Sequence, residues 1–211
     1  MHNYPPGQYI ATHFRCAIDF SVLGLNISQQ EALEILAEKG FCYVQADLAE
    51  IARKEIGASI YEVGALPNEA PGIVNCRTII KWLYSKKGVW LPAHMSGLGI
   101  SVSPEDLCEG DLVYVTDPHS PSGGHVGMAS DAKTVFHANR GIGLVEEPFD
   151  TFSKKDGVEL RGIRRIIVNL ENTLTLTCPP ECYIEWSGDI ASIIRRELGA
   201  REKLNRRQLQ K

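Results

Sequence analysis

Apolar residues recur at two different spacings along this chain, and the change falls after Leu91. Before that point they return every three or four positions, as on one face of a helix, and after it they gather in short runs, as in strands. A capping box at Ser28 predicts a helix that Gly40 ends. The same signal at Asp47 predicts a second helix, which carries Ile56 in its apolar stripe and ends at the next residue.

Asn75 is a favourable N-cap for a third helix, which Gly88 ends. The apolar stripe of this helix consists of Cys76, Ile79, Ile80 and Leu83. The thiol therefore shares the face that packs on the rest of the protein, where a cysteine is more often an inert core residue than a reactive one. The preceding stretch, 59–73, is rich in Pro, Gly and Asn and should form an irregular surface loop.

The second half of the chain contains several short β-rich runs separated by Gly, Pro, Asp and Ser turns. These runs are 112–115, 126–129, 134–137, 144–147 and 163–168. The run 173–177 alternates strictly and predicts an edge strand, and a last helix over 189–198 should break at Gly199. Residues 1–27 show no clear period. Helices followed by consecutive strands predict an α+β fold with a mostly antiparallel sheet.

Length and composition fit one globular domain with extensions. The chain has 211 residues, of which 44% are hydrophobic and 23% charged, as in ordinary soluble proteins. No apolar run approaches the roughly 20 residues that a membrane-spanning helix needs. The N-terminus has no basic segment followed by an apolar core. We therefore expect a cytoplasmic protein if the sequence is complete, and a secreted or cell-wall protein otherwise.

The net charge of −4 is unevenly distributed, because residues 201–211 carry five basic residues against one acidic residue. A basic tail can contact nucleic acid, but no aromatic residues interleave with these charges. We therefore expect a solvent-exposed helix end and no nucleic-acid partner. The sequence leaves the oligomeric state open.

Six cysteines occur at irregular spacings, and Cys178 and Cys182 are their one close pair. No second Cys/His pair completes the four ligands of a zinc site. We therefore expect no metal and no cofactor, and the pair to be either reduced or joined by a local disulfide.

One cysteine and two later histidines suggest nucleophilic chemistry. Cys76 begins a helix, and the unpaired N–H groups there lower the pKa of a thiol, as does the charge of Arg77. His125, between glycines at the start of a strand, can hold the proton of that thiol. His137, on the next strand, can orient the first histidine. On this basis Cys76 should react with alkylating reagents well below about pH 8.

The order of these motifs resembles the NlpC-like cell-wall peptidases, which are compact relatives of papain. The resemblance runs from about Gln45 to Val168 and includes a helix-borne cysteine, Gly-Asp-Leu-Val, Gly-His-Val-Gly and Phe-His-Ala. It implies a papain-like NlpC-type core in which N-terminal helices pack on an antiparallel sheet of about five to six strands. The implied organisation is an N-terminal extension with one helix (1–40), the peptidase-like domain (41–170) and a C-terminal extension with a helix and the basic tail (171–211).

The resemblance also implies roles for individual residues. Cys76 corresponds to the nucleophile, His125 to its proton partner and His137 to the residue that orients His125. The backbone N–H of Cys76 should serve an oxyanion site. Tyr61 stands where the family often has a tyrosine that borders the oxyanion and the substrate.

The nucleophile motif departs from the family pattern. Members usually read Asp-Cys-Ser-Gly, where the acid and the serine grip a free amine of the substrate, whereas this chain reads Asn75-Cys76-Arg77-Thr78. Asn75 and Arg77 are therefore candidate substrate contacts, and Arg77 fits an anionic substrate better than an amine. Elsewhere Asp111 should anchor a turn and a strand, and His94 could line the cleft, although we expect it at the surface.

Three functions remain open from the sequence. The first is a cysteine endopeptidase or amidase that cleaves peptidoglycan stem peptides through a thioester, with a peptide or peptidoglycan fragment as its partner. The second is an acyltransferase that uses the same three residues. The third is a binding module that retains the cleft without catalysis, which the altered nucleophile motif favours and the presence of all three residues opposes.

Overall fold

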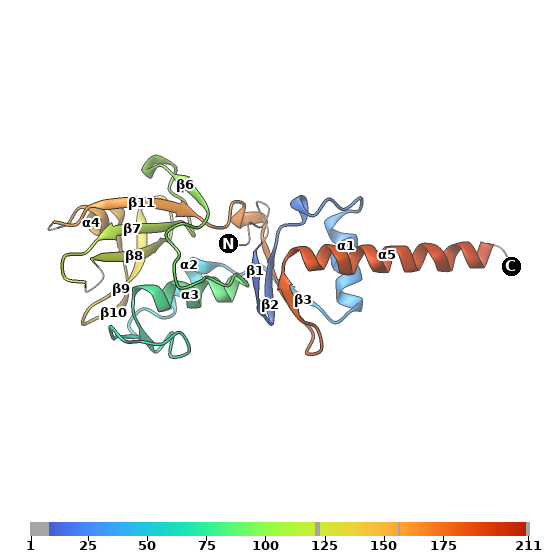
Figure 1. Cartoon of the computed structure of the whole chain (residues 1–211), viewed down its shortest axis with the longest axis horizontal. Helices are drawn as coiled ribbons and strands as arrows, with labels where there is room; N and C mark the ends of the chain where they lie inside the picture. The colour runs from blue at the N-terminus through green and yellow to red at the C-terminus, as the bar shows by residue number, and fades with distance from the viewer. Residues whose placement is uncertain (1–8, 121–122, 156, 210–211) are drawn as a thin grey trace. The chain divides into compact units, whose positions relative to one another are not determined.

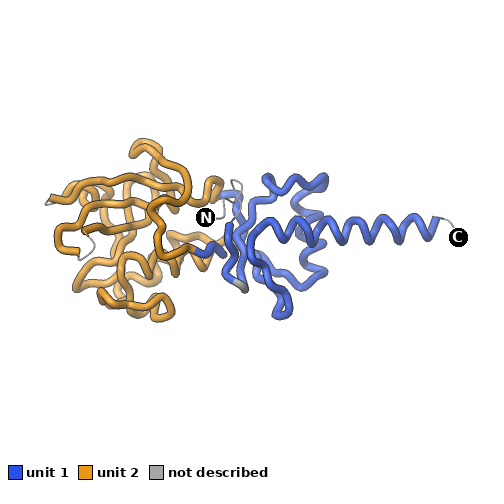
Figure 2. The backbone as a smooth tube through the Cα atoms, viewed as in Figure 1, with its two compact units in different colours: residues 1–45, 87–90, 171–211 blue, residues 46–86, 91–170 orange. Residues whose placement is uncertain are grey.

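The computed structural model describes residues 9–120, 123–155 and 157–209 and divides into two compact units (Figure 2). Unit 1 combines residues 1–45, 87–90 and 171–211, and unit 2 combines residues 46–86 and 91–170. The N-terminal and C-terminal stretches that the sequence suggests as separate extensions thus fall within one unit.

Unit 2 is built on a six-stranded antiparallel sheet in the order β10-β9-β8-β7-β11-β6 (Figure 1). Its strands are β6 (Ile100–Val102), β7 (Leu112–Thr116), β8 (Gly124–Ala129), β9 (Thr134–Asn139), β10 (Gly143–Pro148) and β11 (Leu160–Arg165). The predicted α+β class, antiparallel pairing and strand number are confirmed. The last of these strands begins and ends three residues earlier than the sequence predicts.

Both faces of this sheet carry buried apolar side chains, because successive residues of a strand point to opposite faces. One face bears a cluster that includes Val113, Val115 and Ile163, to which Phe152 of α4 (Phe149–Lys154) adds its ring. The other face bears Leu112 and its partner Met128 on β8, and both side chains are fully buried. A short 3₁₀ helix, η2 (Pro104–Asp106), precedes β7.

Two helices of unit 2 precede the sheet in sequence. Asp47 caps α2 (Leu48–Arg53) by accepting from the backbone N–H of Glu50, as predicted. The helix ends earlier than predicted, because the N–H groups of residues 55 and 56 bond three residues back and wind the chain into tighter turns. Ile56 is 42% exposed there, so its placement in the apolar stripe was wrong.

The loop between α2 and α3 (Cys76–Lys87) contains one regular feature. Two short strands, β4 (Ile60–Tyr61) and β5 (Ile73–Val74), pair in parallel at its ends. The remainder consists mainly of turns, as expected from its composition.

Unit 1 contains a three-stranded sheet in the order β2-β12-β3 and a two-stranded pair of β1 and β13. The bounds are β1 (Ile10–His13), β2 (Arg15–Ile18), β3 (Cys42–Val44), β12 (Leu174–Thr177) and β13 (Ile184–Trp186), with the 3₁₀ helices η1 (Phe20–Val22) and η3 (Leu170–Asn172). The run 173–177 was predicted as an edge strand, but β12 is the central strand here, because β2 and β3 both pair with it. Part of the N-terminal stretch without a clear period supplies β1 and β2.

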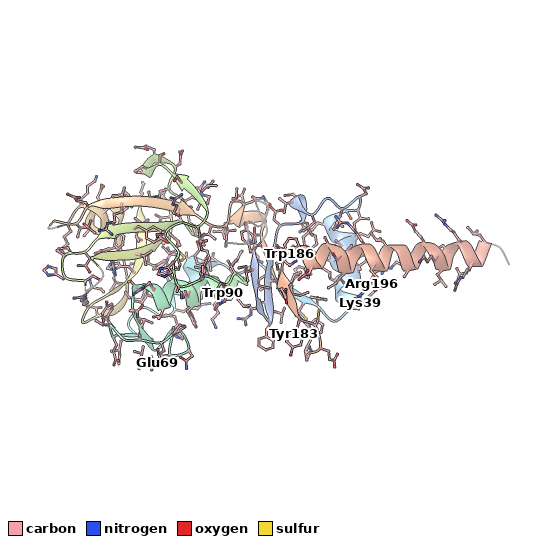
Figure 3. The ribbon with its side chains drawn as sticks, in the orientation of Figure 1. Lys39, Glu69, Trp90, Tyr183, Trp186 and Arg196 are labelled. Carbon is pink, nitrogen blue, oxygen red and sulfur yellow. The ribbon has the colours of Figure 1, made fainter. Side chains whose placement is uncertain are left out.

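Two helices complete unit 1. Ser28 caps α1 (Gln29–Glu38) as predicted, through its hydroxyl and the backbone N–H of Glu31. The last helix, α5 (Gly188–Leu209), continues through Gly199, so the predicted break was wrong. One glycine costs a helix only about 1 kcal/mol, and the strong helix formers that follow it offset this cost. Beyond residue 199 the described side chains are exposed and extend from the helix in several directions (Figure 3).

The segment 87–90 joins unit 1 through backbone contacts. Gly88 adopts a φ of +92°, and a Cβ atom there would lie 2.7 Å from the backbone nitrogen of Ala17. The N–H of Ala17 donates to the carbonyl of Gly88 at 3.1 Å, and the Thr175 hydroxyl donates to the carbonyl of Lys87 at 2.9 Å. The N–H of Trp90 donates to the carbonyl of Ile10 at 2.8 Å. Glycine at the end of α3 therefore permits both the turn and the close approach.

Candidate active site

Asn75 holds the start of α3 in place. Its Oδ1 accepts from the backbone N–H groups of Arg77 and Thr78, both at 3.0 Å, and the Thr78 hydroxyl accepts from the N–H of Asn75 at 2.8 Å. Its Nδ2 donates to the carbonyls of Val63 and Ala65 at 3.3 and 3.2 Å. A carboxylate could cap the helix equally well, but it could not donate to these two carbonyls. The side chain of Asn75 thus ties the helix start to the preceding loop.

Cys76 follows this cap and lies beside strand β8. It is partly exposed, whereas Ile79, Ile80 and Leu83 of the predicted stripe are fully buried. Its sulfur accepts a hydrogen bond from the backbone N–H of Val126. Strands β8 and β9 pair only at residues 128 and 129 of β8, so their ladder stops short of Val126. The opening leaves that N–H free to face the thiol.

His125 and His137 meet across the same opening. The Nε2 atom of His125 lies 2.9 Å from Nδ1 of His137, so one ring donates a hydrogen bond to the other. On its far side, Nε2 of His137 lies 2.9 Å from Oε1 of Glu147 on β10. The carboxylate lies off the direction of the ring N–H, and its closeness to His137 lowers the pKa of Glu147. Three neighbouring strands thus supply a line of two imidazoles and a carboxylate.

Phe152 of α4 supports both imidazole rings. Its ring centroid lies 5.6 Å from that of His125 and 4.9 Å from that of His137. Gly127 allows this arrangement, since a Cβ there would lie 2.4 Å from Val135 and 3.1 Å from the Phe152 ring. The second glycine of the Gly-His-Val-Gly motif therefore has a packing role.

Burial governs the protonation of the candidate pair. Burial, with a smaller effect from His137, lowers the pKa of His125 to about 4, so its imidazole is neutral at pH 7. Burial also raises the pKa of the Cys76 thiol above its ordinary value, although the N–H of Val126 and the charge of Arg77 lower it. The sequence-based expectation of a lowered thiol pKa was therefore wrong. It included the effect of the helix start on the thiol but not the cost of burying the thiolate.

We expect alkylation of Cys76 by iodoacetamide to accelerate as the pH rises past about 9, because only the thiolate reacts and a raised pKa delays its formation. Peptide mass spectrometry of the folded protein would give the rate at each pH, with the exposed Cys42 in the same digest as internal reference. A Cys76 rate that levels off below about pH 8 would contradict this prediction and indicate a stable thiolate–imidazolium pair.

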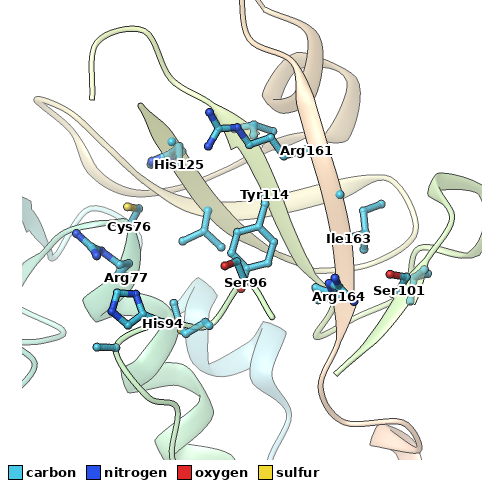
Figure 4. Close-up of a pocket in the computed structure, with 17 residues that line it drawn as sticks. Cys76, Arg77, His94, Ser96, Ser101, Tyr114, His125, Arg161, Ile163 and Arg164 are labelled. Atoms are coloured by element: carbon cyan, nitrogen blue, oxygen red, sulfur yellow. The ribbon is translucent and has the colours of Figure 1, made fainter. Parts of the chain in front are cut away.

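Two cavities flank His125. The first, of about 590 Å³, is lined by Cys76 and Arg77 of α3, the loop 93–96 and residues of β6, β7, β8 and β11 (Figure 4). The second, of about 350 Å³, is lined by Tyr61, His137 and Glu147 among others. The structure therefore places Cys76 and Arg77 in one cavity and Tyr61 in the other, and the lining of neither includes Asn75.

His94 is exposed, as expected, and it also lines the first cavity, which is the other position that the sequence allowed. Three further residues at this site escaped the sequence analysis. Glu147 could have been found by pairing the runs 134–137 and 144–147 as a hairpin, since alternation then places it on the face of His137. Arg161 and Arg164 line the first cavity, and no sequence motif marks them.

The described residues include no group of three His, Cys, Asp or Glu side chains arranged to hold a metal ion. All six cysteines, including Cys178 and Cys182, are free thiols. Within the same described ranges, no helix is long and apolar enough to cross a lipid bilayer.

Comparison with known proteins gives one family and several solved structures. NlpC2 from Trichomonas vaginalis is 21% identical with a TM-score of 0.46, and the match covers 56% of this chain and 45% of that one. An NlpC/P60 family protein from Bacillus cereus is 19% identical with a TM-score of 0.46, over 59% of this chain and 40% of that one. The NlpC/p60 domain of the peptidoglycan hydrolase SagA is 20% identical with a TM-score of 0.42, over 58% of this chain and 98% of that domain.

The chain thus spans less than half the length of the first two structures, and no curated protein matches it. A model of the NlpC/P60 family matches residues 59–161. This match includes the helix of Cys76 and the strands of both histidines. Over residues 59–161, this chain therefore belongs to the NlpC/P60 family.

Proposed function

We propose that this protein is a cysteine endopeptidase or amidase that hydrolyses an amide bond of peptidoglycan stem peptides through Cys76, His125 and His137. Proteins of the NlpC/P60 family are typically cysteine peptidases or amidases that act on peptidoglycan. The observation that carries the proposal is the position of the Cys76 thiol, at the start of α3, against Val126 of β8, next to His125, whose Nε2 lies 2.9 Å from Nδ1 of His137.

The neighbours of each imidazole support one arrangement of the ring protons. The carboxylate of Glu147 lies beside Nε2 of His137 and favours a proton on that nitrogen. Nδ1 of His137 is then an acceptor for the proton on Nε2 of His125. This leaves Nδ1 of His125 with a lone pair. Because the pKa of His125 is about 4, this base is available at neutral pH.

The proposed reaction uses that base twice. His125 takes the proton of the Cys76 thiol as the sulfur attacks the amide carbonyl, and the backbone N–H of Cys76 donates to the developing oxyanion. The imidazolium returns its proton to the departing amine, which leaves a thioester on Cys76. A water molecule, deprotonated by His125, then hydrolyses the thioester to a carboxylate and the free thiol. An acyltransferase would differ only in replacing this water by another acceptor.

Digestion of purified stem peptides and muropeptides, followed by mass spectrometry, tests the proposal. The wild-type protein should release a new amine and a new carboxylate, and Cys76→Ala should release neither. A product joined to an added acceptor would instead indicate acyl transfer. A wild-type protein that cleaves none of these substrates, nor any model amide, would contradict the proposal and favour a binding module.

We expect Glu147→Gln to lower kcat by about ten- to a hundredfold with little change in KM, as part of the 10²–10⁴ that a positioned base contributes. The amide would no longer favour a proton on Nε2 of His137. Glu146→Gln is a matched control, because this adjacent glutamate pairs with Arg53 instead. Steady-state kinetics on the peptide cleaved by the wild type would show the difference. Equal effects of the two substitutions would exclude a positioning role for Glu147.

A further inference from the structure

The cavity beside Cys76 is strongly cationic. Arg77, Arg161 and Arg164 line it, and no aspartate or glutamate belongs to the part of its lining that the structure describes (Figure 4). This charge is local, because the whole chain has a net charge of −4. Three guanidinium groups around a cavity of about 590 Å³ repel one another unless an anion enters.

None of these three arginines forms an ion pair with a carboxylate of the described residues. Two other arginines of the same unit do form ion pairs: Arg165 with Asp111 at 2.8 Å and Arg53 with Glu146 at 2.9 Å. The three arginines of the cavity therefore have guanidinium groups without a carboxylate partner in the described part of the chain, and a guanidinium binds carboxylates and phosphates through paired N–H donors.

A bulge in β11 brings two of these arginines to one face of the sheet. Arg161 and Arg164 are an odd number of positions apart, so regular alternation would place them on opposite faces. The register with β7 shifts between Leu160 and Gly162, which inserts one extra residue and restores both arginines to the cavity side. Gly162, with a φ of +151°, accommodates the distortion.

Tyr114 adds a neutral donor to the same lining. Its hydroxyl oxygen is buried and has no hydrogen-bond partner among the described residues. Burial also raises the pKa of this phenol, so it keeps its proton and can donate. A buried hydroxyl without a partner carries a desolvation cost that a bound acceptor would remove.

From this arrangement we propose that the cavity binds an anionic group of the substrate, of carboxylate or phosphate chemistry, through Arg77, Arg161 and Arg164, with Tyr114 as a further donor. The inference rests on the proposed function, since it assigns this cavity to the substrate that Cys76 attacks. A free amine is excluded by charge, because none of the cavity-lining residues described offers it a carboxylate.

The test uses Cys76→Ala protein, in which no turnover disturbs binding, and isothermal titration at low salt with two separate probes, inorganic phosphate and tricarballylate. Either probe should bind, and the stronger one indicates the source chemistry. Arg161→Gln and Arg164→Gln should each weaken binding about ten- to a hundredfold, as expected for the loss of a charge-assisted contact. Arg161→Lys should restore part of the loss. Arg207→Gln, on α5 of unit 1, removes the same charge and should change nothing.

Binding that is undetectable, or equal in the Arg161, Arg164 and Arg207 variants, would overturn the inference. In that case amide cleavage by the wild type could still stand, and the proposed function with it. Conversely, the wild type could bind the anion through Arg161 and Arg164 and yet cleave no substrate. That result would support the anion site and contradict the proposed peptidase function.

Discussion

Replacement of Cys76 by alanine should lower amide hydrolysis at pH 7 by about 10³-fold or more, and His125→Ala should do nearly the same. The first change removes the nucleophile. The second removes the neutral imidazole that accepts the thiol proton and later protonates the amine. Neither side chain belongs to the fully buried core, so the melting temperature should move by only a few degrees.

The double variant Cys76→Ala/His125→Ala makes this prediction sharper. When two residues act in the same step, removing either one already abolishes their joint contribution to the rate. The double variant should therefore be no slower than the slower single variant. Rates can be compared with the stem peptide that the wild type cleaves best, under saturating conditions. Losses that multiply would show that the two side chains act independently and would contradict the shared mechanism.

Asp111→Ala should lower the free energy of unfolding by about 3–5 kcal/mol, the cost of breaking a buried ion pair from one side. The carboxylate of Asp111 is fully buried and accepts from Nε and Nη2 of Arg165, both at 2.8 Å. It also accepts from the backbone N–H of Cys108 at 3.0 Å. Alanine would leave a guanidinium and a backbone N–H without these acceptors. Urea unfolding followed by circular dichroism gives the change.

Asp150→Ala is the matched control in the same unit. Asp150 pairs with Lys154 on α4, but both side chains are at least 70% exposed, and such pairs contribute less than about 1 kcal/mol. A loss for Asp111→Ala no larger than that for Asp150→Ala would show that the buried pair only offsets its own desolvation.

Local signals in the sequence were sufficient for the elements that carry the site. Asn75 caps α3 by accepting from the backbone N–H groups of Arg77 and Thr78. The start of this helix could therefore be predicted from neighbouring residues alone. The alternation around His125 and His137 likewise predicts two strands. The anchoring role expected for Asp111 is confirmed by its contacts with Cys108 and Arg165.

Features that depend on residues distant in sequence were not predictable in this way. The pKa of Cys76 depends on how deeply other segments bury it, and a helix-start argument contains no term for that burial. The central place of β12 depends on partners more than 125 positions earlier in the chain. Arg161 and Arg164 share the cavity because of a bulge in β11, and the sequence of that strand does not predict the bulge.

The four residues from Lys87 to Trp90 limit how this protein can be divided. They interrupt unit 2 in sequence, and their carbonyl and N–H groups bond to β1, β2 and β12. A gene fragment encoding only 46–170 would lack these partners. The backbone groups at the end of the helix that begins with Cys76 would therefore lose their hydrogen bonds within the protein. The NlpC/P60 portion therefore cannot be transferred alone to another protein. A chimaera would have to include the flanking stretches 1–45 and 171–211 as well.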